Sequence, residues 1–438
     1  MMKRLCQILC AVFLGYGFSN ANADDAPLLS LQAAQETALR NHPKISVGDL
    51  KALAAKEVTR QARSGYFPNL TGNVVAVGTA YDNTRLAASG GLNVPSIFER
   101  NAEGVVLSQL ITDFGRTADL TGSAKLRAQA EDSNAQATRA QILLQVNAAF
   151  YAVLQARSVS RVAEQTVTTR QLFLDQVSAL AKNKLHSELD VSFAKVNLEE
   201  GKLLLSKSRN DLQAALSQLS TLMGFREPKL YRLQEEPLPP DVSTNISEFV
   251  AQALQLRPDL LRLRQEREAA RKFASAEKAL QYPTLSAVGS AGVVPVHERQ
   301  LPDHYAAAGV VLSLPLFVGN LYSARHKEAE LRAKVAGETL RDEENNVIRD
   351  VRVAWLNAQN ASERLRITGQ LLEHAARSFD LAQARYNNGV SSIVELNRAQ
   401  LNKISAEITQ ANTRYEYLYQ RAVLDFQTGQ MATVRKVQ

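Results

Sequence analysis

The sequence contains only two cysteines, Cys6 and Cys10, and both lie in its N-terminal segment. Residues 1–23 have the order of a secretory signal peptide, because two basic residues precede an apolar run that ends at the small-x-small site Ala21-Asn22-Ala23. A buried N-terminal helix is the alternative. Cleavage after Ala23 would leave no cysteine, which excludes disulfides, thiolate metal sites and a cysteine nucleophile. Since the new first residue is Asp24, we also expect no lipid anchor.

Long apolar runs are missing from the rest of the chain, and aromatic residues make up only 6% of it. After Phe18, no stretch approaches the roughly 18 unbroken apolar residues of a membrane-spanning helix. Any passage through a membrane must therefore use strands. The 51 basic and 44 acidic residues are mixed along the chain, without the concentrated basic patch of a nucleic-acid binder. We therefore expect no nucleic-acid partner.

Motifs that carry catalysis are also missing. The sequence has no Walker loop, dinucleotide fingerprint, zinc ribbon or G-x-S-x-G elbow, and its six histidines form no HExxH or other ligand spacing. The sequence therefore predicts neither an enzyme nor a resident cofactor or metal.

An internal repeat organises the chain after the signal segment. Phe67-Pro68 matches Tyr282-Pro283 at an offset of 215 residues, and residues 124–128 match residues 329–333 at an offset of 205. A change of register between such matches indicates extra length in one surface loop. The pattern predicts five segments: a signal peptide (1–23), a first repeat (24–224), an inter-repeat linker (225–244), a second repeat (245–429) and a C-terminal tail (430–438).

Within each repeat the hydrophobic periodicity changes in the same order. It predicts a helix, a β-hairpin, a very long helix, a turn and a further helix. In the first repeat these elements cover about 30–64, 66–112, 116–181, 183–186 and 187–222. In the second repeat they cover about 245–280, 282–314, 321–386, 387–390 and 392–427.

The long helices are too long for a compact domain, since about 66 residues span roughly 100 Å. Leu365, Leu372 and Phe379 recur every seven residues, which favours left-handed coiled-coil packing. An ordinary amphipathic bundle would fit one such seam, but it fits a pair of long helices badly.

The β segments are long enough for tilted membrane strands, which need roughly 9–11 residues. A soluble β-sandwich is the alternative. Four strands cannot close a barrel, and open strand edges do not occur in lipid. Several chains must then share one barrel: eight strands from two chains would be filled by side chains, whereas twelve strands from three chains leave room for a pore.

The order of these elements, with three motifs, resembles the TolC family of outer-membrane efflux channels. The motifs are Leu31-Gln32-Ala33-Ala34 through Asn41-His42-Pro43, Asp113-Phe114-Gly115-Arg116, and Ala384-Arg385-Tyr386-Asn387-Asn388-Gly389-Val390. The resemblance implies a mainly α fold with membrane β structure. Each repeat would be a long coiled-coil hairpin plus a β-hairpin, and a homotrimer would form a twelve-stranded outer-membrane β-barrel continuous with a periplasmic helical barrel.

The resemblance also implies a function and its partners. Such channels lie in the outer membrane of Gram-negative-type bacteria, in contact with its lipid, and extend into the periplasm. They give pump substrates an exit path as the outer component of a tripartite efflux system or a type I secretion system. Their partners are a periplasmic adaptor and an inner-membrane pump or ABC transporter. The cargo cannot be read from this sequence.

The family's entrance can be placed on this chain by matching motifs. The resemblance implies an entrance constriction at Asp190, Glu395 and Arg398, where Arg398 lies close to a position that can be acidic in the family and could neutralise Glu395 as an i,i+3 pair. Ordinary acidic residues at helix N-termini are the alternative explanation for Asp190 and Glu395. The turns that would contact the adaptor are Asn183, Lys184, Leu185, His186, Asn387, Asn388, Gly389 and Val390.

Two other functions stay open at this point. A periplasmic coiled-coil adaptor would have one helical hairpin between compact β domains rather than two repeats, each with a strand pair. A purely structural exported coiled coil would leave the β segments unexplained.

Overall fold

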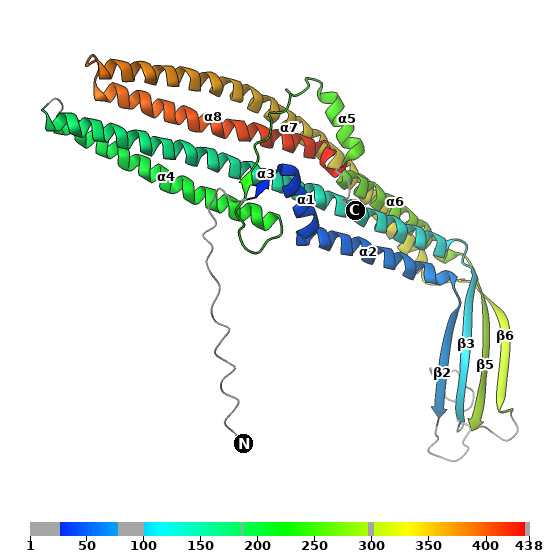
Figure 1. Ribbon diagram of the computed structural model, residues 1–438. Coiled ribbons are helices and arrows are strands. Elements are labelled where there is room, and N and C mark those ends of the chain that lie inside the picture. The colour runs from blue at the N-terminus through cyan, green and yellow to red at the C-terminus, as the bar shows by residue number, and fades with distance from the viewer. Residues whose placement is uncertain (1–26, 78–99, 185–186, 297–301, 434–438) are drawn as a thin grey trace, which may run out of the picture.

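The computed structural model describes residues 27–77, 100–184, 187–296 and 302–433. The molecule is long and narrow, with a four-stranded sheet at one end and two helical hairpins at the other (Figure 1). The elements in chain order are β1 (Leu28–Leu29), α1 (Leu31–Asn41), α2 (Pro43–Arg63), η2 (Ser64–Tyr66), β2 (Asn69–Val77), β3 (Arg100–Thr112), α3 (Arg116–Lys182), α4 (Glu188–Leu222), β4 (Arg232–Leu233), α5 (Ile246–Leu256), α6 (Pro258–Lys278), η3 (Ala279–Gln281), β5 (Thr284–Val296), β6 (His304–Ser313), α7 (Leu321–Asn387), α8 (Ile393–Gln427) and η4 (Gln430–Thr433).

The helix expected over about 30–64 is two helices, and so is the one expected over about 245–280. The breaks fall at His42 and Arg257, and Pro43 and Pro258 are the first residues of the helices that follow. A proline lacks the N–H that a continuous helix would need, but it fits the first turn of a new one. The apolar periodicity runs through both breaks, which is why the sequence predicted single helices.

The long helices have the expected extent. α3 and α7 contain 67 residues each, and the partners α4 and α8 contain 35 each. The Asp113 carboxylate holds the start of α3 by accepting a hydrogen bond from the Thr117 N–H at 2.7 Å. Along α7, Thr368, Ala375 and Ala382 are buried against the neighbouring helices at seven-residue spacing. The predicted seam residues Leu365, Leu372 and Phe379 are half-buried three positions earlier, so the two rows together form the coiled-coil seam.

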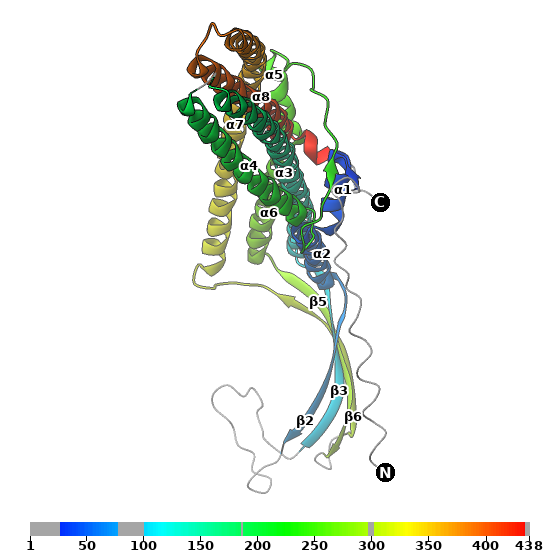
Figure 2. The same ribbon diagram turned by 60° about the vertical axis from the view of Figure 1, so that its left-hand side comes forward.

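The two β-hairpins form one antiparallel sheet in the order β2-β3-β5-β6, so β3 of the first hairpin pairs with β5 of the second. Leu70 faces Leu107, and Leu285 faces Leu312. β2 and β6 are the two edges, and the sheet curves as it leaves the helices (Figure 2). Residues 78–99 of the β-hairpin expected over about 66–112 lie outside the described residues.

The helices continue the sheet as a single layer. Beside the sheet the packing order is α2-α3-α6-α7, and toward the free ends of the hairpins it is α4-α3-α8-α7. α2 leads into edge strand β2, and edge strand β6 leads into α7. Within the described residues, each layer therefore ends on both sides in an element that has a neighbour on one side only.

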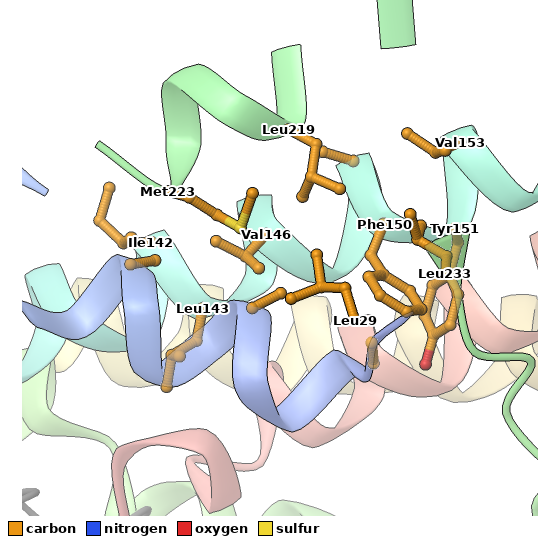
Figure 3. Packing of buried hydrophobic residues seen from close by; sticks show 14 of the residues in the cluster. Leu29, Ile142, Leu143, Val146, Phe150, Tyr151, Val153, Leu219, Met223 and Leu233 are labelled. Carbon is orange, nitrogen blue, oxygen red and sulfur yellow. The ribbon is translucent and has the colours of Figure 1, made fainter. Parts of the chain in front are cut away.

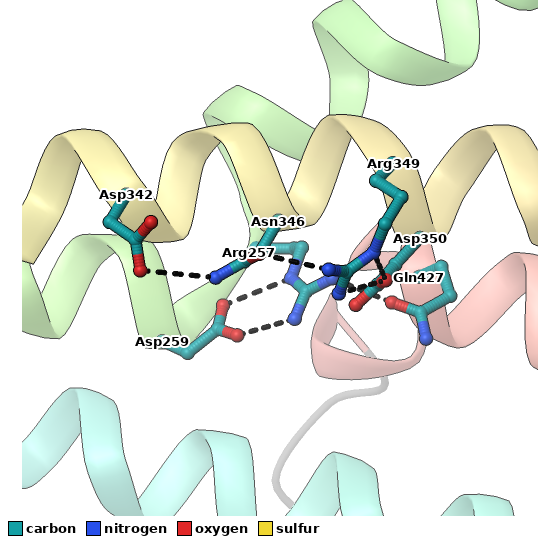
Figure 4. A network of polar contacts seen from close by, with 7 residues as sticks. All are labelled: Arg257, Asp259, Asp342, Asn346, Arg349, Asp350 and Gln427. Atoms are coloured by element: carbon teal, nitrogen blue, oxygen red, sulfur yellow. Dashed lines mark hydrogen bonds and ion pairs between the residues drawn. The ribbon is translucent and has the colours of Figure 1, made fainter.

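The main core lies midway along the molecule, where α1, α3, the end of α4 and α8 meet the two-stranded β1–β4 sheet. Figure 3 shows Val146 and Phe150 of α3 packed with Leu219 and Met223. Phe150 is fully buried. In the second half, the break at Arg257 is tied to the end of α8, because its guanidinium donates to Asp259 at 3.0 Å and to Gln427 at 2.6 Å (Figure 4).

A partly buried carboxylate near this core gives a pH-dependent prediction. Burial raises the pKa of Asp425, although the Arg421 charge opposes the shift. Because the folded pKa exceeds the unfolded one, charging Asp425 costs stability as pH rises through the folded value. We expect Asp425→Asn to raise the melting temperature at pH 7–8 by a few degrees, with the gain disappearing near pH 3. Thermal unfolding at both pH values checks this, with exposed Asp380→Asn as the charge-matched control. An equal gain at both pH values would contradict it.

Candidate functional site

The turn between α3 and α4 is one end of the predicted entrance. Asn183 caps α3, and its side-chain amide donates to the Ala179 carbonyl at 3.0 Å. Lys184 follows with φ 58°, the left-handed conformation in which glycine is common. Leu185 and His186, the other two residues predicted for this turn, lie outside the described residues.

The turn between α7 and α8 closes with a Schellman motif. The Gly389 N–H donates to the Tyr386 carbonyl at 3.0 Å, and the Val390 N–H donates to the Arg385 carbonyl at 3.0 Å. This motif requires a left-handed residue, and Gly389 supplies it with φ 70°. Asn387 and Asn388 end the helix, and Val390 points outward with 65% of its surface exposed. The predicted residues of this turn therefore form an exposed tip that is closed by backbone hydrogen bonds.

Asp190 has a local structural role at the start of α4. Its backbone N–H donates to the Ser187 hydroxyl at 3.2 Å, and its carboxylate accepts from the Ser187 N–H at 3.2 Å. This capping box is the ordinary function of an acidic residue at a helix N-terminus. Asp190 also lies near the other hairpin: burial raises the pKa of the Tyr386 hydroxyl, and the Asp190 charge raises it further. The fold thus brings the two hairpin tips together at this carboxylate.

Glu395 begins α8 in the same way, with its N–H donating to the Ser392 hydroxyl at 3.3 Å. The expected ion pair with Arg398 is wrong. Glu395 instead pairs with Arg385 of α7, at 3.6 Å between Oε1 and Nη1. The antiparallel turn brings α7 against α8, and so places Arg385 opposite Glu395. Both side chains are about half exposed, so the pair contributes little stability.

Arg398 lines an open groove between α7 and α8, close to the tip. Its other lining residues are His374, Arg377, Ser378, Leu381, Ala382, Arg385, Glu395, Ala399 and Asn402. The sequence analysis missed Arg377 and Arg385, because it examined only the turn and the helix after it. Folding the sequence about Asn388 as an antiparallel hairpin would have found both.

Behind the groove, the tips are packed by apolar side chains. Phe173 of α3 packs on Ala382, Leu396 and Ala399, and its ring lies 5.7 Å from that of Tyr386. The α7–α8 pair therefore has one face against α3 and one face open to solvent.

The model of the family described as outer membrane efflux protein matches residues 34–225 and 249–430. The chain belongs to the outer membrane efflux protein family.

Relatives of this efflux protein cover most of its length. It is 24% identical to outer membrane protein TolC of Escherichia coli K12 over 95% of this chain and 84% of that protein. It is 22% identical to the alkaline protease secretion protein AprF of Pseudomonas aeruginosa over 93% of this chain and 85% of that protein. The crystal structure of VceC from Vibrio cholerae superposes with a TM-score of 0.77 at 18% identity, covering 91% of this chain and 96% of that one.

These findings confirm the predicted class of function, an outer-membrane channel for efflux or secretion. The family consists of channel proteins, which agrees with the prediction that this efflux protein is not an enzyme. Among the described residues, no group of three or more histidine, cysteine or acidic side chains could hold a metal ion. Within the same residues, no helix is apolar and long enough to span a membrane.

Proposed function

We propose that three copies of this chain form a continuous tunnel, with a twelve-stranded barrel in the outer membrane and a helical barrel in the periplasm. The tunnel gives substrates an exit path from the periplasm to the exterior, as the outer component of a tripartite efflux or type I secretion system. The predicted signal peptide would direct its export, and no lipid anchor is needed.

The observation that carries this proposal is the match between the open edges of the two layers. β2 and β6 are the edges of the sheet, and α2 and α7, which are continuous with those strands, are the edges of the adjoining helical layer. Unpaired strand edges do not occur in lipid. A second copy that pairs β6 with the next β2 would bring α7 against the next α2 at the same time.

The edge helices carry apolar stripes suited to that contact. On α2, the stripe lies on the side opposite the residues that face α3, and on α7 it lies on the side opposite those that face α6. The α2 stripe consists of Val47, Leu50, Ala54 and Val58, and the α7 stripe of Ala324, Leu331 and Val335, all exposed in the single chain. Their spacing of three, four or seven residues is that of a coiled-coil seam.

The two stripes also lie at the same height above the sheet. Val58 is five residues before the end of α2 at Arg63, and Ala324 is three residues after the start of α7 at Leu321. The contact is heterologous, so it must close into a ring or continue as a polymer. Three copies give the smallest ring that leaves an open pore.

Apolar side chains at the junction of sheet and helices fit the boundary of a bilayer. The connector between β6 and α7 exposes 88% of Leu316 and 85% of Phe317. The rings of Phe114 and Tyr282 lie 6.2 Å apart at the neighbouring strand ends. Aromatic residues concentrate at such membrane–water interfaces.

The opposite end of the tunnel is the entrance. Asp190, Glu395 and Arg398 surround it in three copies. The turns Asn183–His186 and Asn387–Val390 contact a periplasmic adaptor, behind which an inner-membrane pump or ABC transporter supplies the cargo. The backbone hydrogen bonds around Gly389 and the exposure of Val390 support a docking role for this tip.

The test is the mass and conductance of the mature protein in detergent. We expect light scattering, corrected for bound detergent, to give three times the chain mass, and planar bilayers to show single-channel conductance. A monomer that stays in solution without detergent would contradict the proposal of a shared barrel. It would favour the adaptor or structural alternative.

A further inference from the structure

We propose that the groove between α7 and α8 gathers anions at the tunnel entrance, and that Arg398 sets a preference for anions over cations there. This inference rests on the proposed function, which places Arg398 at the entrance. It assigns a charge selectivity to that entrance.

The charges that line the groove are mostly positive. Arg377, Arg385 and Arg398 face it, together with His374, whereas Glu395 is its only carboxylate within the described residues. Glu395 is 3.6 Å from Arg385, so one arginine already balances it. Two guanidinium groups remain, beside the hydrogen-bonding side chains Ser378 and Asn402. Guanidinium groups bind carboxylate and phosphate oxygens well because they offer several N–H donors in one plane.

The neighbouring hairpin does not reverse this balance. Glu188 and Asp190 are the acidic residues in the first turn of α4, and the Asp190 carboxylate accepts the Ser187 N–H in the capping box. Lys182 and Lys184 end the preceding helix and begin the turn. The two lysines offset the two carboxylates of this tip, so the arginines of the groove leave a net positive charge at the entrance.

Among the groove residues, Arg398 is the strongest candidate for setting the preference for anions. Its side chain is exposed on α8, one turn beyond Glu395. Among the ion pairs of the described residues, none involves Arg398. Three copies around one axis add their potentials, and a narrow passage concentrates that field. A charge about 5 Å from a permeating ion changes its local concentration about four-fold in a water-like dielectric.

The experiment is the reversal potential of single channels in a KCl gradient at low ionic strength, where screening is weak. We expect the wild-type permeability ratio of chloride to potassium to exceed one. Arg398→Glu should lower this ratio by about four-fold or more. Arg398→Gln should lower it less, and Glu395→Gln should raise it.

A matched control separates the groove from the overall charge. Arg341→Glu makes the same charge reversal on α7, at an exposed position about 65 Å along the helix from Arg385. It should leave the ratio within the spread of the wild type. Trimer mass should be unchanged in every variant.

The outcomes distinguish the two proposals. A wild-type channel that prefers potassium, or an unchanged ratio in Arg398→Glu, overturns the anion-gathering groove but leaves the channel. The same shift in Arg341→Glu overturns the role of Arg398. Absence of conductance in the wild type overturns the proposed function itself.

Discussion

Gly224→Ala and Gly429→Ala are expected to destabilise the protein by about 2–5 kcal/mol each. Both glycines have a left-handed backbone, with φ 85° and 81°. A Cβ on Gly224 would lie 2.6 Å from the Asn41 carbonyl oxygen, and one on Gly429 would lie 2.9 Å from the Leu256 carbonyl carbon. These neighbours are backbone atoms that cannot rotate away. The conformational penalty and the steric overlap therefore act together.

The measurement is chemical denaturation of each variant in detergent, followed by the loss of helical circular dichroism. Gly337→Ala and Gly369→Ala are the matched controls, because both glycines lie inside α7 with nothing within 4 Å of an added Cβ. Alanine should stabilise these two positions by about 0.5–1 kcal/mol. The steric explanation is wrong if all four substitutions shift the midpoint in the same direction.

These two glycines pack against the two helix breaks. Gly224, two residues after the end of α4, lies against Asn41 just before the break at His42, and Gly429, two residues after the end of α8, lies against Leu256 just before the break at Arg257. In each half, the last turn of a short helix thus packs tightly on the place where another helix restarts. A side chain at either glycine would push the two elements apart.

Local patterns predicted the helices and strands well, but not their partners. The left-handed residue at Gly389 and the apolar spacing of α7 are properties of neighbouring residues, so the sequence contains them directly. The pairing of β3 with β5 joins residues such as Leu107 and Gly289, which are far apart in the chain. No local periodicity specifies such a contact, so the strand order could not be predicted.

At the entrance, too, local sequence patterns did not specify which side chains meet. Asp190 and Glu395 were placed at the entrance by the resemblance to the family, whereas Arg385 lies on another helix and pairs with Glu395 only after the hairpin folds. An i,i+3 neighbour such as Arg398 was the obvious partner along one helix, but its side chain lines the groove instead. The geometry of the turn, rather than spacing along α8, decides which arginine reaches the carboxylate.

Cysteine cross-linking between α2 and α7 is expected to join separate chains, and the largest product is expected to contain three chains. Leu50→Cys combined with Val335→Cys, and Ala54→Cys combined with Leu331→Cys, occupy one antiparallel register of the two stripes. Within one chain α3 and α6 separate α2 from α7, a distance of roughly 25 Å at 8–10 Å per helix pair. A short bismaleimide cannot span it, so any product must link two copies.

The measurement is denaturing electrophoresis of membranes treated with the reagent. The chain has no cysteine after Cys10, so the introduced pair provides the only thiols of the cleaved protein. We expect dimer and trimer bands and nothing larger, because a heterologous contact that closes after three copies leaves no free edge. Leu50→Cys with Leu381→Cys is the control, since Leu381 lies near the far end of α7 and should not reach α2. Bands larger than the trimer would indicate an open polymer. A cross-linked dimer in the control variant would contradict the proposed register of α2 and α7. A trimer limit would mean that the edges of the sheet and of the helical layer close together in one ring.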